Sequence, residues 1–176
     1  NFTILFCSNN SILKRNKNFL FLVNVINKFS ETNNINFIIC GEKNIVKNKF
    51  DFSNKIKLIE TGFINSENEL STIYNAADVT AIPSNKEAFG QVASESCASG
   101  TPVIGLKNTG LSDIINNKEN GYICEKEDID EFINGINWIK NQNHDLITKK
   151  CQQSVLKFSN DKISEEYLKV YNKIIN

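Results

Sequence analysis

Hydrophobic residues occur along this chain in short continuous runs that alternate with stretches of helical spacing. The runs are rich in β-branched and aromatic residues and predict strands over 2–7, 35–40, 56–59, 79–82, 102–105 and 121–124. Helical spacing predicts helices over 19–29, 67–76, 111–115, 128–139, 145–157 and 161–175. Because the strand runs are continuous, we expect a parallel sheet buried on both faces. The prediction is an α/β fold with a doubly wound, Rossmann-like parallel sheet in a single domain.

Two carboxylates, Glu87 and Glu95, lie eight residues apart around a predicted strand-to-helix turn. An uninterrupted helix would place them about 80° apart and two turns distant, too far to share a small ligand. We therefore expect the helix to begin near Gly90, so that Glu87 lies in the preceding turn. Glu95 would then lie one turn beyond Gln91 on the same face. Gly100 is expected to follow the helix in a left-handed conformation.

The first turn of this helix is a predicted anion site. Its N–H groups, from Phe89 to Val92, have no partner within the helix and favour a phosphate. The alternative is that both glutamates are ordinary surface carboxylates. Ligands of doubly wound sheets bind at the carboxyl ends of the strands. At that edge we expect the loop 8–17, the pair Gly62–Phe63 and the turn 87–90 to converge.

Three cations in the first loop could neutralise a diphosphate, although a solvated loop is the ordinary alternative. They are Lys14, Arg15 and Lys17, with Lys17 the stronger candidate and Arg15 the weaker. Glu42 is expected to be exposed.

Three other features have two interpretations each. Phe63 could fill the core or flank a nucleobase. The segment 108–113 could serve as nothing more than a helix cap, through Ser112 and Asp113, or it could face a ligand. The apolar residues of the last helix are predicted to pack against the body rather than to form a partner site, and they are Tyr167, Leu168, Val170, Tyr171, Ile174 and Ile175.

Composition narrows the chemistry. Lys plus Arg and Asp plus Glu both number 20, and no basic block interleaves with aromatic residues, so a nucleic-acid surface is not expected. The apolar runs are far too short to span a membrane. The five scattered cysteines are predicted to be reduced and buried, and the only histidine, His144, to lie on the surface. Catalysis would then depend on carboxylates, cations and backbone dipoles. The chain has no Met and begins directly with a strand, so we expect a piece of a longer protein.

The stretch 83–104 resembles a family signature. Pro83-Ser84, Glu87-Ala88-Phe89-Gly90-Gln91-Val92, Glu95 and Ala98-Ser99-Gly100-Thr101-Pro102-Val103-Ile104 together resemble the Glu-x7-Glu motif of the group 1, family 4, glycosyltransferases of GT-B fold. Similarity extends to 38–41, 70–78, 121–122 and the closing helices. The resemblance implies that 1–176 is the C-terminal, nucleotide-sugar-binding domain of a two-domain retaining glycosyltransferase whose N-terminal acceptor domain is absent.

The resemblance also implies roles for individual residues. Glu87 would approach the sugar ring, Glu95 would hold the ribose hydroxyls, and Lys17, with Arg15, would bind the diphosphate. The catalytic candidates are Glu87 and Lys17, and the substrate-binding candidates are Glu95, Arg15, Ala88, Phe89, Gly90, Gln91, Val92, Gly62 and Phe63. No metal or cofactor is implied, the nucleotide sugar being the donor substrate.

The chain departs from the family pattern at several positions. Asn18 replaces the glycine that follows the loop lysine, which is tolerable because Asn accepts left-handed geometry. Ser8 and Asn9 stand where Gly and Arg are common, Thr109-Gly110 replaces a Gly-Gly pair, and Asp113 replaces a Glu.

The implied activity is sugar transfer to a glycan or lipid-linked acceptor in the synthesis of bacterial surface polysaccharide or lipopolysaccharide. A cytoplasmic protein with peripheral association at the inner face of the membrane would fit that role. Two alternatives stay open. One is a non-catalytic nucleotide-binding or regulatory module, and the other is a sugar-phosphate synthase or phosphorylase of the same fold.

Overall fold

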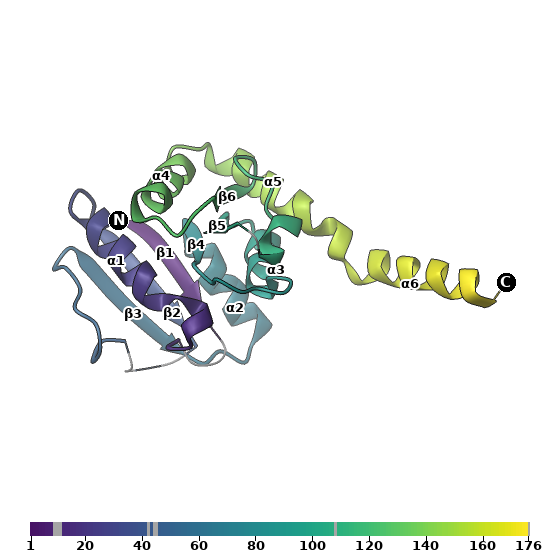
Figure 1. Cartoon of the computed structure of the whole chain (residues 1–176), viewed down its shortest axis with the longest axis horizontal. Helices are drawn as coiled ribbons and strands as arrows, with labels where there is room; N and C mark the ends of the chain where they lie inside the picture. Colours follow the sequence, from purple (N-terminus) through teal and green to yellow (C-terminus); the bar gives the residue numbers. More distant parts are fainter. Residues whose placement is uncertain (9–11, 42, 44–45, 108, 176) are drawn as a thin grey trace.

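The chain folds around a six-stranded parallel sheet with the strand order β3-β2-β1-β4-β5-β6 (Figure 1). The computed structural model describes residues 1–175 except 9–11, 42, 44–45 and 108. The strands are β1 (Phe2–Cys7), β2 (Ile35–Cys40), β3 (Ile56–Gly62), β4 (Val79–Ile82), β5 (Val103–Leu106) and β6 (Gly121–Cys124). All predicted strands are present, with β3 longer than expected and β5 shifted by one residue.

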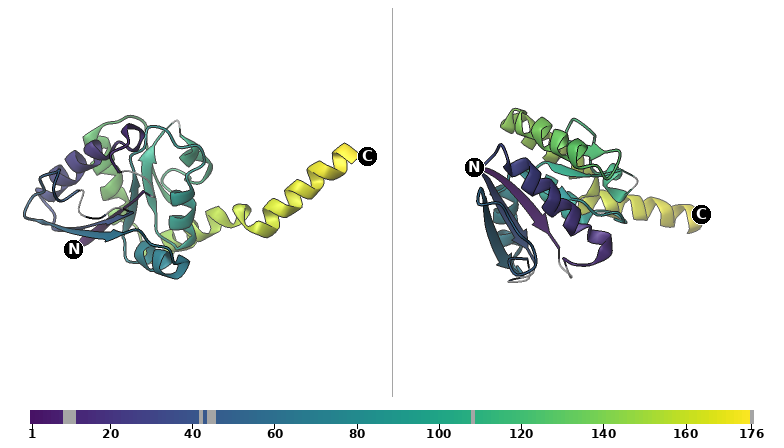
Figure 2. Two further views of the ribbon diagram at one scale, coloured as in Figure 1. Left: turned by 90° about the horizontal axis from the view of Figure 1, so that it is seen from below. Right: turned by 60° about the vertical axis from the view of Figure 1, so that its left-hand side comes forward.

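Helices cover both faces of the sheet, which confirms the doubly wound α/β fold (Figure 2). The covering helices are α1 (Phe19–Ser30), α2 (Glu67–Asn75), α3 (Gln91–Ala98), α4 (Ile129–Lys140) and α5 (His144–Val155), and a further helix, α6 (Asn160–Ile175), follows them. Helices α1 and α4 pack on one face, and α2, α3 and α5 pack on the other. The helix expected over 111–115 is instead a short 3-10 turn, Gly110–Asp113, capped by Thr109 rather than by Ser112.

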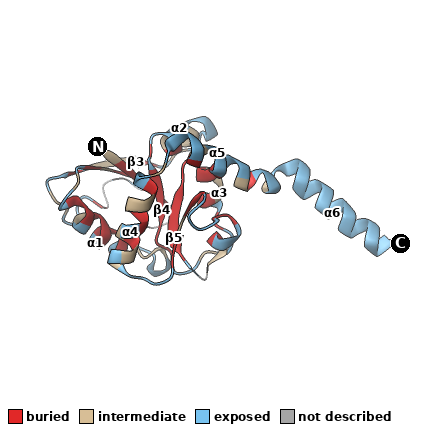
Figure 3. Cartoon of the chain, turned by 90° about the horizontal axis from the view of Figure 1, so that it is seen from above, coloured by how far each residue is buried: buried red, intermediate tan, exposed pale blue. Residues whose placement is uncertain are grey.

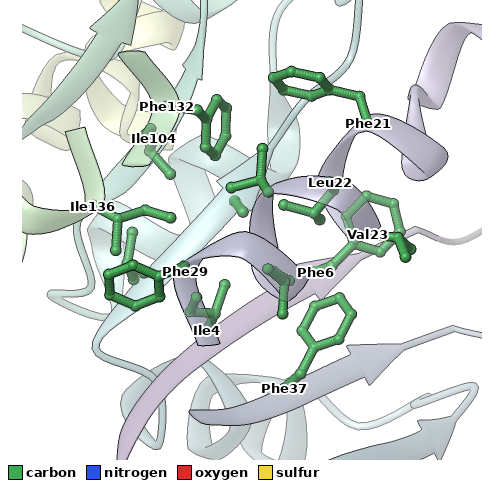
Figure 4. Close-up of a cluster of buried hydrophobic side chains, with 14 of the residues drawn as sticks. Ile4, Phe6, Phe21, Leu22, Val23, Phe29, Phe37, Ile104, Phe132 and Ile136 are labelled. Atoms are coloured by element: carbon green, nitrogen blue, oxygen red, sulfur yellow. The ribbon is translucent and has the colours of Figure 1, made fainter. Parts of the chain in front are cut away.

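The strand residues alternate between two apolar faces, as a doubly covered sheet requires. In β1, Ile4 and Phe6 join the core under α1 and α4, whereas Leu5 and Cys7 face α2. Figure 4 shows the first of these cores, where aromatic rings from helices and strands interlock. The rings of Phe21 and Phe132 meet edge to face at 5.5 Å between centroids, which joins α1 to α4.

Several local expectations are confirmed. Ser66 caps α2 by accepting a hydrogen bond from the Glu69 N–H, and Gly100 follows α3 with φ +89°. All five cysteines are free and buried. His144 is exposed at the start of α5. In the described part of the chain, no helix is both long and apolar enough for a membrane crossing.

The prediction that the last helix packs against the body is wrong. Helix α6 projects away from the sheet and is exposed along its length (Figure 3). The apolar side chains that were expected to pack are 52–81% exposed, and they are Tyr167, Leu168, Val170, Tyr171, Ile174 and Ile175. Helical periodicity reveals an apolar face, but it does not identify the surface that covers that face.

Stability should therefore depend on the core and not on α6. Replacing fully buried Phe132 by Ala should lower the free energy of unfolding by about 3–5 kcal/mol, because it removes a ring from the α1–α4 contact. The Leu168→Ala control removes a 60% exposed side chain and should change stability by less than about 0.5 kcal/mol. Urea unfolding followed by Trp138 fluorescence measures both. A similar loss in the two variants would mean that α6 packs on the body.

Candidate functional site

A crevice opens at the carboxyl edge of the sheet between β1 and β4. Strand β1 is in register with β2 from Phe2 to Cys7 but with β4 at only two positions, Ile4 with Val79 and Leu5 with Thr80. Beyond those pairs the two strands no longer share a ladder. The chain after β1 enters α1 on one face, and the chain after β4 enters α3 on the other. This is the topological switch point at which doubly wound sheets bind ligands.

Lys17 and Glu87 meet across this crevice. The Lys17 Nζ lies 3.3 Å from Glu87 Oε2, and the two side chains are only 23% and 21% exposed. Lys17 is positioned by Asn18, which has φ +52° and joins the 3-10 turn Arg15–Lys17 to α1. The left-handed geometry expected of Asn18 is thus confirmed. The structure brings together the two residues that the sequence analysis named as catalytic candidates.

The turn that carries Glu87 is held by a hydrogen bond from the segment that follows β5. The Gly110 N–H donates to the Glu87 carbonyl oxygen at 2.7 Å. A Cβ on Gly110 would overlap the Ala88 carbonyl oxygen, so only glycine allows the two loops to approach this closely. The Thr109 hydroxyl accepts from the Leu111 N–H, so the segment caps its 3-10 turn through Thr109 and not through Ser112 or Asp113. Asn108 lies outside the described residues, as does Glu42.

Helix α3 begins at Gln91, as predicted, with Gly90 at φ +90° as its N-cap. Because glycine has no side chain to cap the helix, the N–H groups of Gln91 and Val92 remain available to a ligand. The Ala93 N–H donates to the Gly90 carbonyl oxygen at 2.8 Å. A hollow of about 290 Å³ faces them, lined by Ser8, Lys14, Asn16, Lys17, Glu87, Gln91 and Val92. An ammonium group, a helix N-terminus and a partly buried carboxylate therefore border one space. Such a space suits an anion bonded to a polar, hydroxyl-bearing group.

Glu95 lies farther along α3, beside a second hollow of about 350 Å³ between α2 and α3. The Tyr74 hydroxyl donates to Glu95 Oε2 at 2.9 Å. Tyr74 is 1% exposed, and its burial, with Cys7 and Glu95 nearby, raises the pKa of its hydroxyl well above the usual range. The hydroxyl is therefore protonated and holds the carboxylate in place. Gln91 borders the first hollow and Glu95 the second.

The other candidate residues are placed less centrally. Arg15 lines a neighbouring hollow with Lys86 and not the one that contains Lys17. The Phe89 ring meets Phe158 edge to face, with 5.1 Å between centroids. Gly62 ends β3, an edge strand two positions from β1, and Phe63 beyond it is 57% exposed. The loop after β3 is thus separated from the crevice by β2.

A model of the family "Glycosyl transferases group 1" matches residues 4–155. The chain belongs to this family. A glycosyltransferase of Methanocaldococcus jannaschii is 30% identical over 158 residues, which is 86% of this chain and 40% of that protein. The D-inositol 3-phosphate glycosyltransferase of Corynebacterium diphtheriae is 45% identical over 60 residues, which is 34% of this chain and 14% of that protein.

Solved structures show the same fold. The Anabaena protein HepE in complex with UDP has a TM-score of 0.77 and 20% identity, and the match covers 98% of this chain and 49% of that one. This group 1 glycosyltransferase chain thus spans less than half the length of these relatives.

Sequence reasoning missed two residues of the site. Tyr74 lies 21 positions before its partner Glu95, and the two are on different helices. In the sequence Gly110 is only part of a loop, whereas in the structure its N–H donates to the carbonyl oxygen of Glu87. Both interactions are non-local, and neither residue type is unusual in its own segment. The local signal for Gly110 is that it keeps the second glycine of the family's Gly-Gly pair, whereas Thr109 replaces the first.

Removing the Tyr74 hydroxyl should destabilise the chain. The variant Tyr74→Phe leaves Glu95 without its buried donor and should lower the free energy of unfolding by about 1–2 kcal/mol. Tyr167→Phe is the matched control, because Tyr167 is 62% exposed on α6. This substitution should change the free energy of unfolding by less than about 0.5 kcal/mol. Urea denaturation of the two variants makes the comparison. Equal stability in both would show that the Tyr74–Glu95 hydrogen bond contributes nothing to folding.

Proposed function

We propose that this chain is the donor-binding half of a retaining, metal-independent, hexosyl-type glycosyltransferase. The observation that carries the proposal is the Lys17–Glu87 pair facing the uncapped N-terminus of α3 at the β1–β4 switch point. Membership of the group 1 family supports a nucleotide sugar as donor. The solved structure of HepE with UDP supports a nucleoside diphosphate as the part that is recognised.

Each group has a role in transfer. The Lys17 ammonium and the N–H groups of Gln91 and Val92 attract the diphosphate, whose negative charge grows as the bond to the sugar breaks. In this proposal these positive groups supply the charge stabilisation that a metal ion provides in metal-dependent transfer. Glu87 holds the ammonium of Lys17 and lies next to the departing sugar. Catalysis in this proposal depends on stabilising the leaving group at a fixed position.

Glu95 is proposed to bind the ribose. Its Oε2 accepts from Tyr74, and its Oε1 has no hydrogen bond to the other described residues. A carboxylate whose second oxygen has such free acceptor capacity can accept hydrogen bonds from the ribose hydroxyls. Gln91 is one turn away on α3, between Glu95 and the diphosphate.

A second domain is proposed to supply the acceptor. The exposed apolar face of α6 and the small share of each relative's length that the chain spans both support a larger protein. The proposed acceptor is a glycan or a lipid-linked compound of bacterial surface polysaccharide or lipopolysaccharide synthesis, handled by a cytoplasmic protein at the inner face of the membrane. The Corynebacterium relative is named for D-inositol 3-phosphate, which supports including phosphorylated compounds among the proposed acceptors.

Nucleotide affinity tests the role of Glu95. In calorimetry with UDP and with GDP, Glu95→Ala should weaken binding about tenfold, because the ribose loses a charge-assisted hydrogen bond. Glu165→Ala removes an exposed carboxylate on α6 and is the matched control, with no change expected. Equal affinity of the wild type and the Glu95 variant would disprove the ribose assignment.

Variants of Lys17 and Glu87 should differ in nucleotide affinity in the same assay. Lys17→Ala removes the cation proposed to hold the diphosphate and should reduce affinity about tenfold or more. Glu87→Gln keeps the shape of the side chain and should keep nucleotide affinity within about threefold, because Glu87 is proposed to contact the sugar and not the phosphates. Uridine, which lacks phosphates, should bind the wild type and the Lys17 variant equally. Unchanged sugar transfer by Glu87→Gln in the longer protein would disprove the role of Glu87, and nucleotide binding without sugar transfer by the unaltered longer protein would indicate a non-catalytic module.

A further inference from the structure

A second cationic hollow lies beside the proposed donor site. It has a volume of about 610 Å³ and is formed by the loops after β1 and β4, with Lys14, Arg15, Asn16, Asn85 and Lys86 as its lining. Three of these side chains are cations, two are carboxamides, and none is a carboxylate. The chain as a whole carries equal numbers of cationic and anionic side chains, 20 of each. The concentration of positive charge here is therefore a property of this hollow and not of the protein's overall charge.

The three cations are not neutralised within the described part of the chain. None of the ion pairs between described residues includes Lys14, Arg15 or Lys86. Glu87, the residue after Lys86, is held by Lys17 instead. Like charges brought together on facing loops repel one another, and an anion between them relieves that repulsion. Arg15 adds a planar fork of N–H donors that matches a phosphate group.

The loops that form this hollow are tied to each other. The Asn85 N–H donates to the Asn16 carbonyl oxygen at 3.0 Å. The Asn18 amide donates to Asn85 Oδ1 at 3.4 Å, and the Lys17 N–H closes the 3-10 turn on the Lys14 carbonyl at 2.9 Å. The cations are thus presented by two segments held in a fixed relation. A hollow of this kind needs little ordering when an anion binds.

The cationic hollow is contiguous with the proposed donor site. Lys14 and Asn16 line both spaces, whereas Arg15 and Lys86 line the cationic hollow and not the donor hollow. A diphosphate held by Lys17 and the N-terminus of α3 would leave Arg15 and Lys86 unused. A second anion could then be bound on the far side of Lys14, in the cationic hollow.

We propose that Arg15 and Lys86, with Lys14 between the two spaces, bind a phosphate group of the acceptor. The inference rests on the proposed function, and it deepens that function by naming the acceptor as a phosphorylated compound. It also moves Arg15 from the donor diphosphate to the acceptor. The phosphate could belong to a soluble phosphate ester or to a lipid headgroup, since both present the same oxygens to the cations.

Binding of inorganic phosphate to the chain saturated with UDP, or with GDP if that binds more tightly, tests the proposal. Amide NMR shifts on 15N-labelled protein should show a saturable phosphate site at 14–16 and 85–86 while the nucleotide stays bound. Arg15→Gln and Lys86→Gln should each weaken phosphate binding about tenfold, as expected for loss of a charge-assisted hydrogen bond. Neither should change nucleotide affinity, which also shows that both variants fold.

The matched control is Lys150→Gln, an exposed lysine on α5 that should alter neither affinity. Sedimentation with phosphatidylcholine vesicles, with and without phosphatidic acid, distinguishes the sources of the phosphate. Retention by phosphatidic acid that Arg15→Gln and Lys86→Gln abolish would indicate a lipid headgroup, and phosphate binding without retention would indicate a soluble acceptor.

Two results would overturn the inference. One is displacement of the nucleotide by phosphate, which would mean a single anion site, and the other is unchanged phosphate affinity in both variants. If the wild-type chain binds neither UDP nor GDP, that result counts against the proposed function. Nucleotide binding without a separate phosphate site overturns only the acceptor assignment.

Discussion

The short ladder between β1 and β4 is the constraint on which the site depends. Because only two residue pairs join these strands, the last residues of β1 and β4 diverge before either chain turns into a helix. The turns that follow the two strands lie on either side of this gap, and their side chains meet across it. Lys17 and Glu87, 70 positions apart in sequence, meet there at 3.3 Å.

A buried polar network fixes α3 over this crevice. Ser96 Oγ lies 2.8 Å from the Thr80 hydroxyl of β4 and 2.9 Å from the Thr101 carbonyl oxygen. The Thr101 hydroxyl in turn donates to the Tyr74 carbonyl oxygen of α2 at 2.8 Å. In the described residues, no buried side-chain N or O atom lacks a partner. A fully satisfied network specifies one position for the helix, and it thereby fixes where Gln91 and Glu95 point.

The sequence predicts most of the fold because its signals are local. Continuous apolar runs locate all six strands, and Gly90 with the spacing of the two glutamates places the start of α3 correctly. The Tyr74–Glu95 hydrogen bond could not be predicted, because nothing within α2 or α3 specifies the packing of one on the other. The sequence ranks Lys17 above Arg15 as a diphosphate ligand, but it does not show that the two side chains line different hollows. Only the 3-10 turn over Arg15–Lys17 and left-handed Asn18 direct them to different hollows.

The distribution of charge shows the same difference between sequence and structure. A formal net charge of zero argues against nucleic acid as a partner, yet it conceals a strongly cationic edge. The cations that face the crevice come from two loops that are separated in sequence by α1, β2, β3, α2 and β4. Topology, and not composition, concentrates them beside Glu87 and the N-terminus of α3. Electrostatic recognition in a neutral protein of this fold therefore has to be judged at the carboxyl edge of the sheet, where the strand order determines which loops become neighbours.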